Sequence, residues 1–165
     1  MTQDYVKELF TYCDGVLRWR VSRSNRTRVG SAAGYCRSDN GRCVINVDGK
    51  LMFAHRLIFL FHHGWLPDEI DHIDTDPTNN RIENLRSATR AQNQWNARKR
   101  KDNTSGVKGV SWYAPTKRWT AQIRVNGQRK RLGYFSTIDA AAAAIAAAQR
   151  DSHGEFANHG VLKNG

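Results

Sequence analysis

Four polar side chains between residues 71 and 93 have the types and spacing that metal-assisted hydrolysis requires. Asp71 and His72 are adjacent, Asn84 lies twelve residues further on, and Asn93 nine residues after that. Histidine exchanges a proton near neutral pH, so it can take one from water. A carboxylate and an amide carbonyl are hard oxygen ligands, which favour Mg²⁺ or Mn²⁺ over zinc. The spacing therefore predicts a histidine base and a metal ion acting on a phosphate ester.

Strand, loop, strand and helix are the elements expected to position these residues. Short strands are predicted at 70–73 and 82–86, and Thr89-x-x-Gln92 is a capping box that would open the helix carrying Asn93. Neighbours on a strand point to opposite faces, so Asp71 and His72 can have separate tasks. A base histidine also needs an acceptor on its other nitrogen, and an amide oxygen from a neighbouring strand would serve.

Each of these residues also has a purely structural interpretation. His72 could be a structural histidine, and Asn79, Asn80 and Asn84 could satisfy their own backbone in turns. Asp74-x-Asp76 resembles the start of a calcium loop, but the glycine and terminal glutamate of an EF-hand are missing at the required offsets. We therefore expect these two carboxylates to cap the loop.

The charge distribution indicates a nucleic-acid partner. The formal net charge is +11, and an acidic island separates two basic flanks. Residues 1–66 carry 10 basic and 5 acidic side chains, residues 67–97 carry 3 and 6, and residues 98–165 carry 13 and 4. A basic excess of this size favours a polyanion, although a solvated basic surface is the alternative.

The cysteines and the hydropathy of the chain indicate the cellular compartment in which the protein is expected to act. Three cysteines (Cys13, Cys36 and Cys43) with no C-x-x-C pair predict small buried side chains in a reducing cytosol rather than disulfides or a zinc cage. The most apolar stretch, 51–66, is too short and too interrupted by histidine and arginine to span a bilayer. The beginning of the chain lacks the pattern of a signal peptide.

Further elements are predicted on both sides of the 68–97 run. We expect a helix at 4–12, a strand at 15–20, a hairpin at 43–53 turning at Asp48-Gly49, and a helix at 54–63. The basic run 98–101 marks the domain boundary, followed by strands at 109–113, 119–125 and 129–134 and an alanine-rich helix from about 138 to 150. The expected fold class is α+β, with domains at 1–100 and 101–165.

The run 54–97 resembles the HNH (ββα-metal) nuclease motif, in the variant whose third residue is asparagine and which occurs in phage nicking homing endonucleases. The resemblance includes Ala54-His-Arg-Leu57 and Asn79-Asn-Arg-Ile-Glu-Asn-Leu85. It implies that His72 is the general base, that Asp71 and Asn93 ligate Mg²⁺ (or Mn²⁺), and that Asn84 orients the imidazole and braces the loop. The implied reaction is DNA phosphodiester hydrolysis to 5′-phosphate and 3′-hydroxyl ends.

Residues 103–159 resemble the Apetala-two (ethylene-response-factor) DNA-binding domain. The matching segments include Ser105–Trp112, Lys117–Arg124, Leu132-Gly-Tyr-Phe135 and His153–Ala157. The resemblance implies a three-stranded antiparallel sheet that enters the DNA major groove and is backed by one helix. Alternation predicts that Trp119, Ala121 and Ile123 face that helix.

The predicted DNA-contacting residues follow from the charge pattern and from this resemblance. Arg124 and Arg131 are the candidates for base contact, because arginine can grip guanine through two hydrogen bonds. Lys108, Arg129 and Lys130 are expected at phosphates, and Arg56 could reach phosphate or only extend along the surface. The remaining candidates are Arg98, Lys99, Arg100, Lys101, Ser111, Tyr113 and Gln122.

The resulting hypothesis is a site-selective endonuclease acting on double-stranded DNA in the cytoplasm of a bacterial host. A monomer would nick one strand and a dimer would cut both, and we expect the monomer. The relatives in question often behave as homing nucleases. The alternative is a non-catalytic sequence-specific regulator, although a scaffold would not need Asp71, His72, Asn84 and Asn93 together. An RNA-binding role lacks the expected base-stacking motif.

Overall fold

The computed structural model describes residues 1–22, 27–99, 102–125 and 127–157. The chain divides into two compact units, Met1–Thr89 and Arg90–Gly165. This division falls between residues 89 and 90 and not at the basic run where the sequence predicts a boundary. Helix α3 (Arg90–Asn96), which was expected to complete the nuclease motif, belongs by its packing to the second unit.

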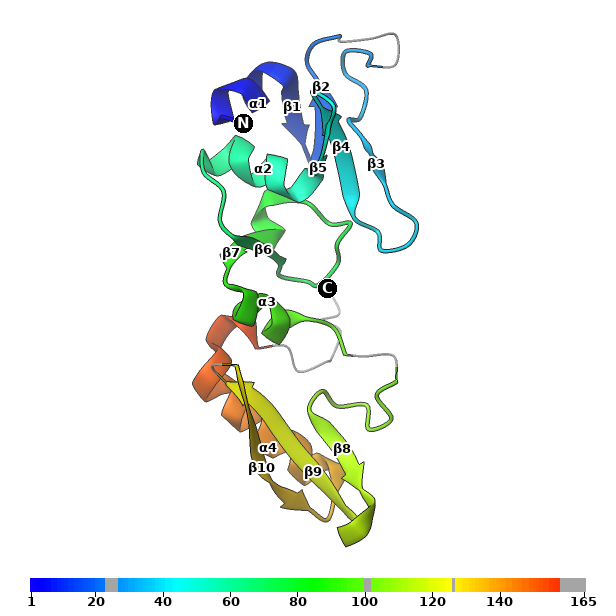
Figure 1. Ribbon diagram of the computed structural model, residues 1–165, viewed down its shortest axis with the longest axis vertical. Coiled ribbons are helices and arrows are strands. Elements are labelled where there is room, and N and C mark those ends of the chain that lie inside the picture. The colour runs from blue at the N-terminus through cyan, green and yellow to red at the C-terminus, as the bar shows by residue number, and fades with distance from the viewer. Residues whose placement is uncertain (23–26, 100–101, 126, 158–165) are drawn as a thin grey trace. The chain divides into compact units, whose positions relative to one another are not determined.

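The described residues of the first unit form two helices and three small antiparallel sheets (Figure 1). Its helices are α1 (Gln3–Leu9) and α2 (Ala54–His63). Its strands and its 3-10 turn are β1 (Phe10–Cys13), β2 (Val16–Trp19), β3 (Tyr35–Cys36), β4 (Cys43–Val47), β5 (Lys50–Phe53), β6 (Glu69–His72), η1 (Ile82–Asn84) and β7 (Leu85–Ala88).

Helix α2 is the centre of the first core. Val6, Leu57 and Ile58 are fully buried where α1, α2 and the sheets meet. The helix has the predicted bounds and ends at Gly64, whose φ of 77° gives the left-handed cap that glycine favours. The hairpin β4–β5 is also confirmed, and Asp48 and Gly49 both have positive φ, as a tight two-residue turn requires.

The helix predicted at 4–12 is too long. It ends at Leu9, and the residues after it form β1, which pairs with β2. The turn between the strands is Asp14-Gly15, a second two-residue turn with positive φ at both positions. Phe10 pairs across the hairpin with Trp19, with ring centroids 4.6 Å apart, so aromatic cross-strand packing overrides the helical pattern.

The prediction for the cysteines is also wrong. Cys36 and Cys43 form a disulfide between β3 and β4, at positions that are partners in the strand register. Cys13 is an exposed free thiol. An odd number of cysteines means that one must stay unpaired, but it does not exclude a disulfide between the other two. Cysteines at partner positions on neighbouring strands are close enough to form one.

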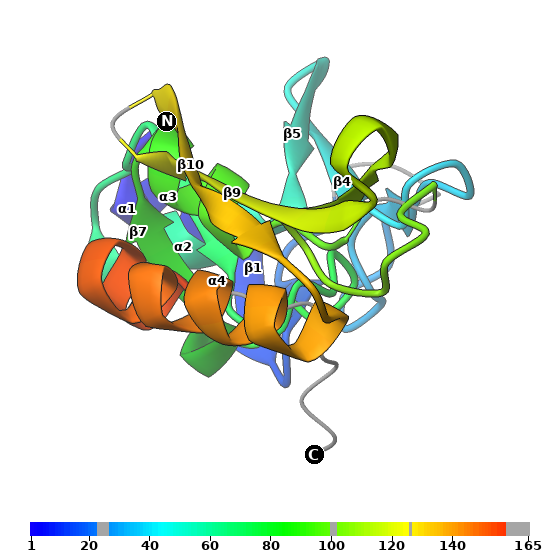
Figure 2. The same cartoon turned by 90° about the horizontal axis from the view of Figure 1, so that it is seen from below.

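The second unit is a three-stranded antiparallel sheet backed by α4 (Ile138–His153), as Figure 2 shows. Its strands, in the order β10-β9-β8, are β8 (Val110–Tyr113), β9 (Arg118–Val125) and β10 (Gln128–Phe135). The unit also includes α3 and the 3-10 turns η2 (Ala114–Thr116) and η3 (Gly154–Phe156). The strands and the helix predicted here are confirmed.

Small side chains allow α4 to approach the sheet closely. Ala141 on α4 and Ala121 on β9 are both fully buried, in a core that also contains Val110 and Ile145. The Thr137 hydroxyl caps the helix by accepting from the Ala140 amide at 3.2 Å. Asn126-Gly127 is a pair that predicts a hairpin turn between the last two strands, but Asn126 lies outside the described residues.

Candidate active site and DNA-binding face

The hairpin β6–β7 places Asp71 and His72 on opposite faces, as predicted. Asp71 is 3% exposed, and its register partner is Arg86. The Arg86 Nε and Nη2 atoms both lie 2.8 Å from Asp71 Oδ2. This charge-assisted contact fixes the direction of a buried carboxylate.

His72 is held by an amide oxygen from the loop that follows β6. Its Nε2 atom lies 3.0 Å from Asn80 Oδ1, and Asn80 is 4% exposed. Asn80 Nδ2 donates to the Thr78 carbonyl at 3.3 Å, which determines the end of the amide that faces the imidazole. An acceptor at Nε2 favours the tautomer with its proton there, so the lone pair lies on Nδ1.

Asn84 contacts this loop through both ends of its side-chain amide. Its Oδ1 accepts from the Asp74 amide at 3.0 Å, and its Nδ2 donates to Asp74 Oδ1 at 2.9 Å and to the Asn79 carbonyl at 2.8 Å. Asp74 and Asp76 cap the loop, since Asp74 Oδ1 also accepts from the Asp76 amide at 2.8 Å. Asn80 supplies the amide oxygen that faces the His72 imidazole, whereas Asn84 contacts the loop around it, and the orienting role expected of Asn84 remains a prediction.

His55 on α2 is a buried neighbour of His72 that sequence reasoning left without a role. The His55 and His72 rings meet edge to face, with their centroids 5.2 Å apart. The Phe53 ring stacks on His55, with a centroid distance of 5.4 Å. Burial, followed by the charges of His72, Arg42 and Arg56, lowers the pKa of His55 to about 3. A neutral ring therefore packs beside His72 at neutral pH. The sequence signal that could have indicated a role for His55 is its position in Ala54–Leu57, a segment that takes part in the resemblance to the HNH motif.

The Arg56 guanidinium is hydrogen-bonded to the segment that follows α2. Its Nη1 and Nη2 atoms donate to the carbonyls of Asp68 and Pro67, at 3.2 and 3.3 Å. These contacts tie α2 to the start of β6. The phosphate contact that the sequence suggested for Arg56 remains a prediction, while its local structural role is clear.

Lys108 closes the end of α3 within the second unit. Its Nζ donates to the carbonyls of Trp95 and Ala97 at 2.7 Å and of Gln94 at 3.3 Å. Burial lowers the pKa of Lys108 to about 8, and three carbonyls are the acceptors that its ammonium form requires. The predicted phosphate contact by Lys108 does not match this inward position. Asn93 lies on the helix that Lys108 caps.

The donor chemistry of the expected metal ligands suits a hard divalent cation. Asp71 supplies a carboxylate and Asn93 an amide oxygen, which are ligand types that Mg²⁺ and Mn²⁺ accept. The described parts of the chain contain no cluster of three or more His, Cys, Asp and Glu side chains that could share an ion. The expected set has a single carboxylate, so water and phosphate oxygens would have to complete the coordination.

The predicted DNA face in the second unit shares one side of the sheet, opposite α4. Register pairs Gln122 with Arg131 and Arg124 with Arg129. Gln122 is half-buried, and the other residues of the predicted set are exposed: Ser111, Tyr113, Arg124, Arg129 and Arg131. Arginine side chains therefore line two neighbouring strands.

A β-bulge adds Tyr134 to this face. The register shifts between Arg131 and Gly133, which brings Tyr134 to the side of Arg131. The Arg131 guanidinium lies 5.3 Å from the Tyr134 ring, and its Nη1 donates to the Tyr134 hydroxyl at 2.8 Å. The Tyr113 ring packs beside the Tyr134 ring, and their centroids are 5.4 Å apart. Strict alternation would have turned Tyr134 away, so sequence reasoning missed it.

The basic run that separates the two matching segments is only partly described. Arg98 and Lys99 are exposed, and Lys99 Nζ donates to the Gly106 carbonyl at 3.1 Å. Arg100 and Lys101, the other two predicted DNA contacts here, lie outside the described residues.

Comparisons with known proteins now identify the family. A family model described as HNH endonuclease matches residues 52–95, and one described as AP2 domain matches residues 105–150. Protein 3.8 of Escherichia phage T7 is 36% identical over 88 residues, which are 53% of this chain and 72% of the relative. The chain belongs to the HNH endonuclease family. No solved structure matches this HNH protein significantly.

Membership confirms the resemblance to HNH enzymes with an AP2-like domain. An HNH domain supports a nuclease that acts on DNA, and both domains imply DNA binding. Within the described residues of this HNH protein, none of the helices combines the length and apolar character needed to cross a membrane.

Proposed function

We propose that this protein is a metal-dependent endonuclease that hydrolyses a DNA phosphodiester, with His72 as the general base. The observation that carries the proposal is the contact between His72 Nε2 and Asn80 Oδ1. It favours a lone pair on Nδ1, the atom that would take the proton from the attacking water. A neutral His55 beside the ring adds no competing positive charge at neutral pH.

Asp71 and Asn93 would hold the Mg²⁺ or Mn²⁺ ion. The ion would supply positive charge to the phosphate and to the leaving oxygen. Arg86 orients Asp71 through Oδ2. Asn84 acts as a brace, because it ties Asp74 and Asn79 into the loop from which Asn80 reaches His72.

The AP2-like sheet would supply affinity and sequence choice through its arginine face. We propose that a monomer nicks one strand of double-stranded DNA, as a single active site would do, in the cytoplasm of a bacterial host. We also propose that the protein acts as a homing endonuclease, in keeping with the phage origin of the relative.

The chemistry of the cut ends tests the reaction. Purified protein and Mg²⁺ should convert supercoiled plasmid to open circles, and EDTA should prevent it. DNA ligase seals only a nick with a 5′-phosphate and a 3′-hydroxyl, so it should return the product to closed circles. Nicks that ligase cannot seal without end repair would contradict the proposed chemistry.

A non-catalytic DNA-binding regulator is the second candidate. The ion pair between Asp71 and Arg86 favours it, because a buried carboxylate satisfied by arginine also has a structural use. A regulator would bind DNA through the arginine face but leave plasmid and native target intact with both Mg²⁺ and Mn²⁺.

A further inference from the structure

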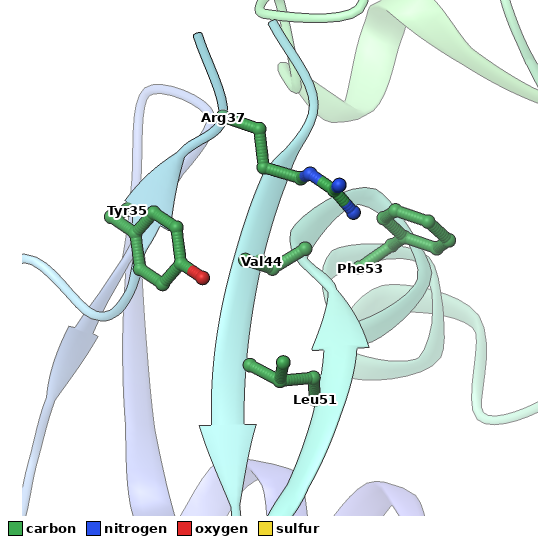
Figure 3. A pocket seen from close by; sticks show the side chains of 5 residues that line it. All are labelled: Tyr35, Arg37, Val44, Leu51 and Phe53. Atoms are coloured by element: carbon green, nitrogen blue, oxygen red, sulfur yellow. The ribbon is translucent and has the colours of Figure 1, made fainter. Parts of the chain in front are cut away.

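The outward face of the β3–β4–β5 sheet carries a hollow that the proposed chemistry does not use. It has a volume of about 210 Å³ and is lined by Tyr35, Arg37, Val44, Leu51 and Phe53 (Figure 3). We call it the outer hollow. Register places Tyr35, Val44 and Phe53 in one row across the three strands.

The floor of the outer hollow is apolar and lies outside the main core. Ile45 and Val47 pack into the core, whereas Val44 points the other way and is still only 5% exposed, because the walls cover it. The walls themselves are open, since Tyr35 is 60% and Leu51 63% exposed. An uncovered apolar site with aromatic walls suits a flat ring better than a phosphate group.

Arginine side chains surround this apolar site. Figure 3 shows the Arg37 guanidinium pointing toward the Phe53 ring. Arg37 also makes an exposed pair with Asp39, with Nε 3.3 Å from Oδ1, which is the weak type of surface pair that an anion can displace. The Arg42 guanidinium lies over the Phe53 ring, 5.5 Å from its centroid. The Phe53 ring thus contacts both His55 and Arg42, and the exposed Tyr35 ring offers a π-face beside this positive charge.

A chain of ring contacts links the outer hollow to the candidate base. Phe53 forms a wall of the hollow and stacks on His55, and His55 contacts the His72 ring. All three residues belong to the first unit. A group bound in the hollow would therefore lie near the phosphate on which His72 is proposed to act.

We propose that the outer hollow binds one unpaired nucleotide of the DNA substrate. The base would lie over Val44 and stack on the Tyr35 ring, with its phosphates beside Arg37 and Arg42. Only an unpaired base can present its whole face to such a site, while its backbone keeps the negative charge that the arginines require. The inference rests on the proposed function, because it places the nucleotide in the DNA that is cut.

Binding to a bulged duplex tests the proposal. The full-length protein is titrated in EDTA with a fluorescent duplex carrying one bulged adenosine, and with the same duplex fully paired. The wild-type protein should bind the bulged duplex more tightly. Tyr35→Ala together with Leu51→Ala should weaken binding of the bulged duplex by about 5- to 100-fold, the usual range for losing a stacked base. Both side chains are exposed, and circular dichroism checks the fold.

The matched control is Val29→Ala, which removes an equally exposed apolar side chain (65%) of the same unit. It should leave the preference for the bulge unchanged. Equal affinity for both duplexes, or equal losses on both in the double variant, would overturn the proposal. So would a concentration-dependent dimer that the double variant abolishes without affecting DNA, because a second copy would then occupy the hollow.

Failure of this inference can be told from failure of the proposed function. The binding assay needs no cleavage, so a bulge preference without Mg²⁺-dependent nicking would contradict only the nuclease. Nicking without a bulge preference would contradict only the outer hollow.

Discussion

The contact between His72 and Asn80 favours one tautomer of the imidazole. The amide of Asn80 is buried, and its other end is held by the Thr78 carbonyl, so the oxygen cannot turn away from Nε2 without losing a hydrogen bond. A buried polar group that is satisfied at both ends is costly to rearrange. The tautomer of His72 is therefore determined by the loop and not by the strand on which it lies.

Replacing Asn80 by alanine should lower kcat by about 10- to 100-fold, the usual cost of losing a partner that orients an active-site histidine. The tautomer would no longer be selected, while DNA affinity should remain. Single-turnover nicking and gel-shift titrations measure the two quantities. Asn79→Ala removes one amide of the same loop that donates to Asp74 Oδ2, and it should cost far less. Equal effects of both variants would show that only loop stability matters.

His55 should make the protein sensitive to acid. Its folded-state pKa of about 3 lies below the ordinary 6.5, so below pH 6.5 the unfolded chain binds a proton that the folded chain refuses. The free energy of unfolding should then fall by up to about 1.4 kcal/mol per pH unit toward pH 3. His55→Phe should remove this contribution in urea titrations at pH 7, 5.5 and 4.5, whereas exposed His63→Gln should not. An unchanged slope in His55→Phe would contradict the assignment.

The candidate residues could be named from the sequence, but the side chains that hold them could not. Asp71 and His72 became candidates because Asn84 and Asn93 follow them at the spacing of the HNH motif. Asn79 and Asn80 are identical in type and adjacent in a turn, so nothing in the pattern indicates that one holds Asp74 and the other the imidazole. The chain path of the loop decides this, and it depends on Asn84.

At the level of elements, local turn chemistry and close packing were the reliable signals. Asp48-Gly49 and the helix stop at Gly64 determine their elements within a few residues, so α2 and the β4–β5 hairpin could be predicted. The helix at the beginning of the chain was overextended because the pairing of Phe10 with Trp19 is a tertiary contact. Tyr134 was missed for a related reason, since a bulge reverses the alternation of a strand.

Lys108 should act on the stability of the second unit rather than on DNA. Lys108→Met keeps the stem but removes the donors to three α3 carbonyls, and should lower the free energy of unfolding by about 1–3 kcal/mol. The salt dependence of DNA binding should stay as it is. Urea unfolding measures the stability, and DNA binding between roughly 50 and 200 mM salt measures the salt dependence.

The exposed lysine on β10 provides the matched comparison for Lys108. Lys130→Met should leave stability unchanged, and if Lys130 contacts a phosphate it should reduce the slope of log affinity against log salt by about one. A reduced slope in Lys108→Met would show that its ammonium group contacts DNA after all.

At the scale of the whole molecule, packing and motif divide the chain differently. The HNH match spans residues 52–95, whereas the first compact unit ends at Thr89, so Asn93 lies on a helix that packs with the AP2-like unit. The family match follows the residues proposed to act in catalysis, whereas the division into compact units follows the packing of the chain. The assignment of α3 to the nuclease module is therefore a functional proposal, and the basic residues on both sides of the acidic island fit two DNA-facing modules.

Replacing Asn93 tests whether it is the proposed metal ligand. Asn93→Ala should weaken the dependence on Mg²⁺, so that nicking requires a higher metal concentration or is lost, while affinity for DNA in EDTA stays unchanged. Exposed Gln94→Ala on the same helix is the control. If Asn93→Ala nicks with the wild-type metal dependence, Asn93 is not a ligand.

The most direct test of the account compares wild type and His72→Ala on supercoiled plasmid with Mg²⁺. The account predicts open circles with the wild-type protein, a rate lower by about 10²- to 10⁴-fold in His72→Ala, and equal DNA affinity for both proteins. Nicking by His72→Ala at the wild-type rate would contradict the role of His72 as the general base.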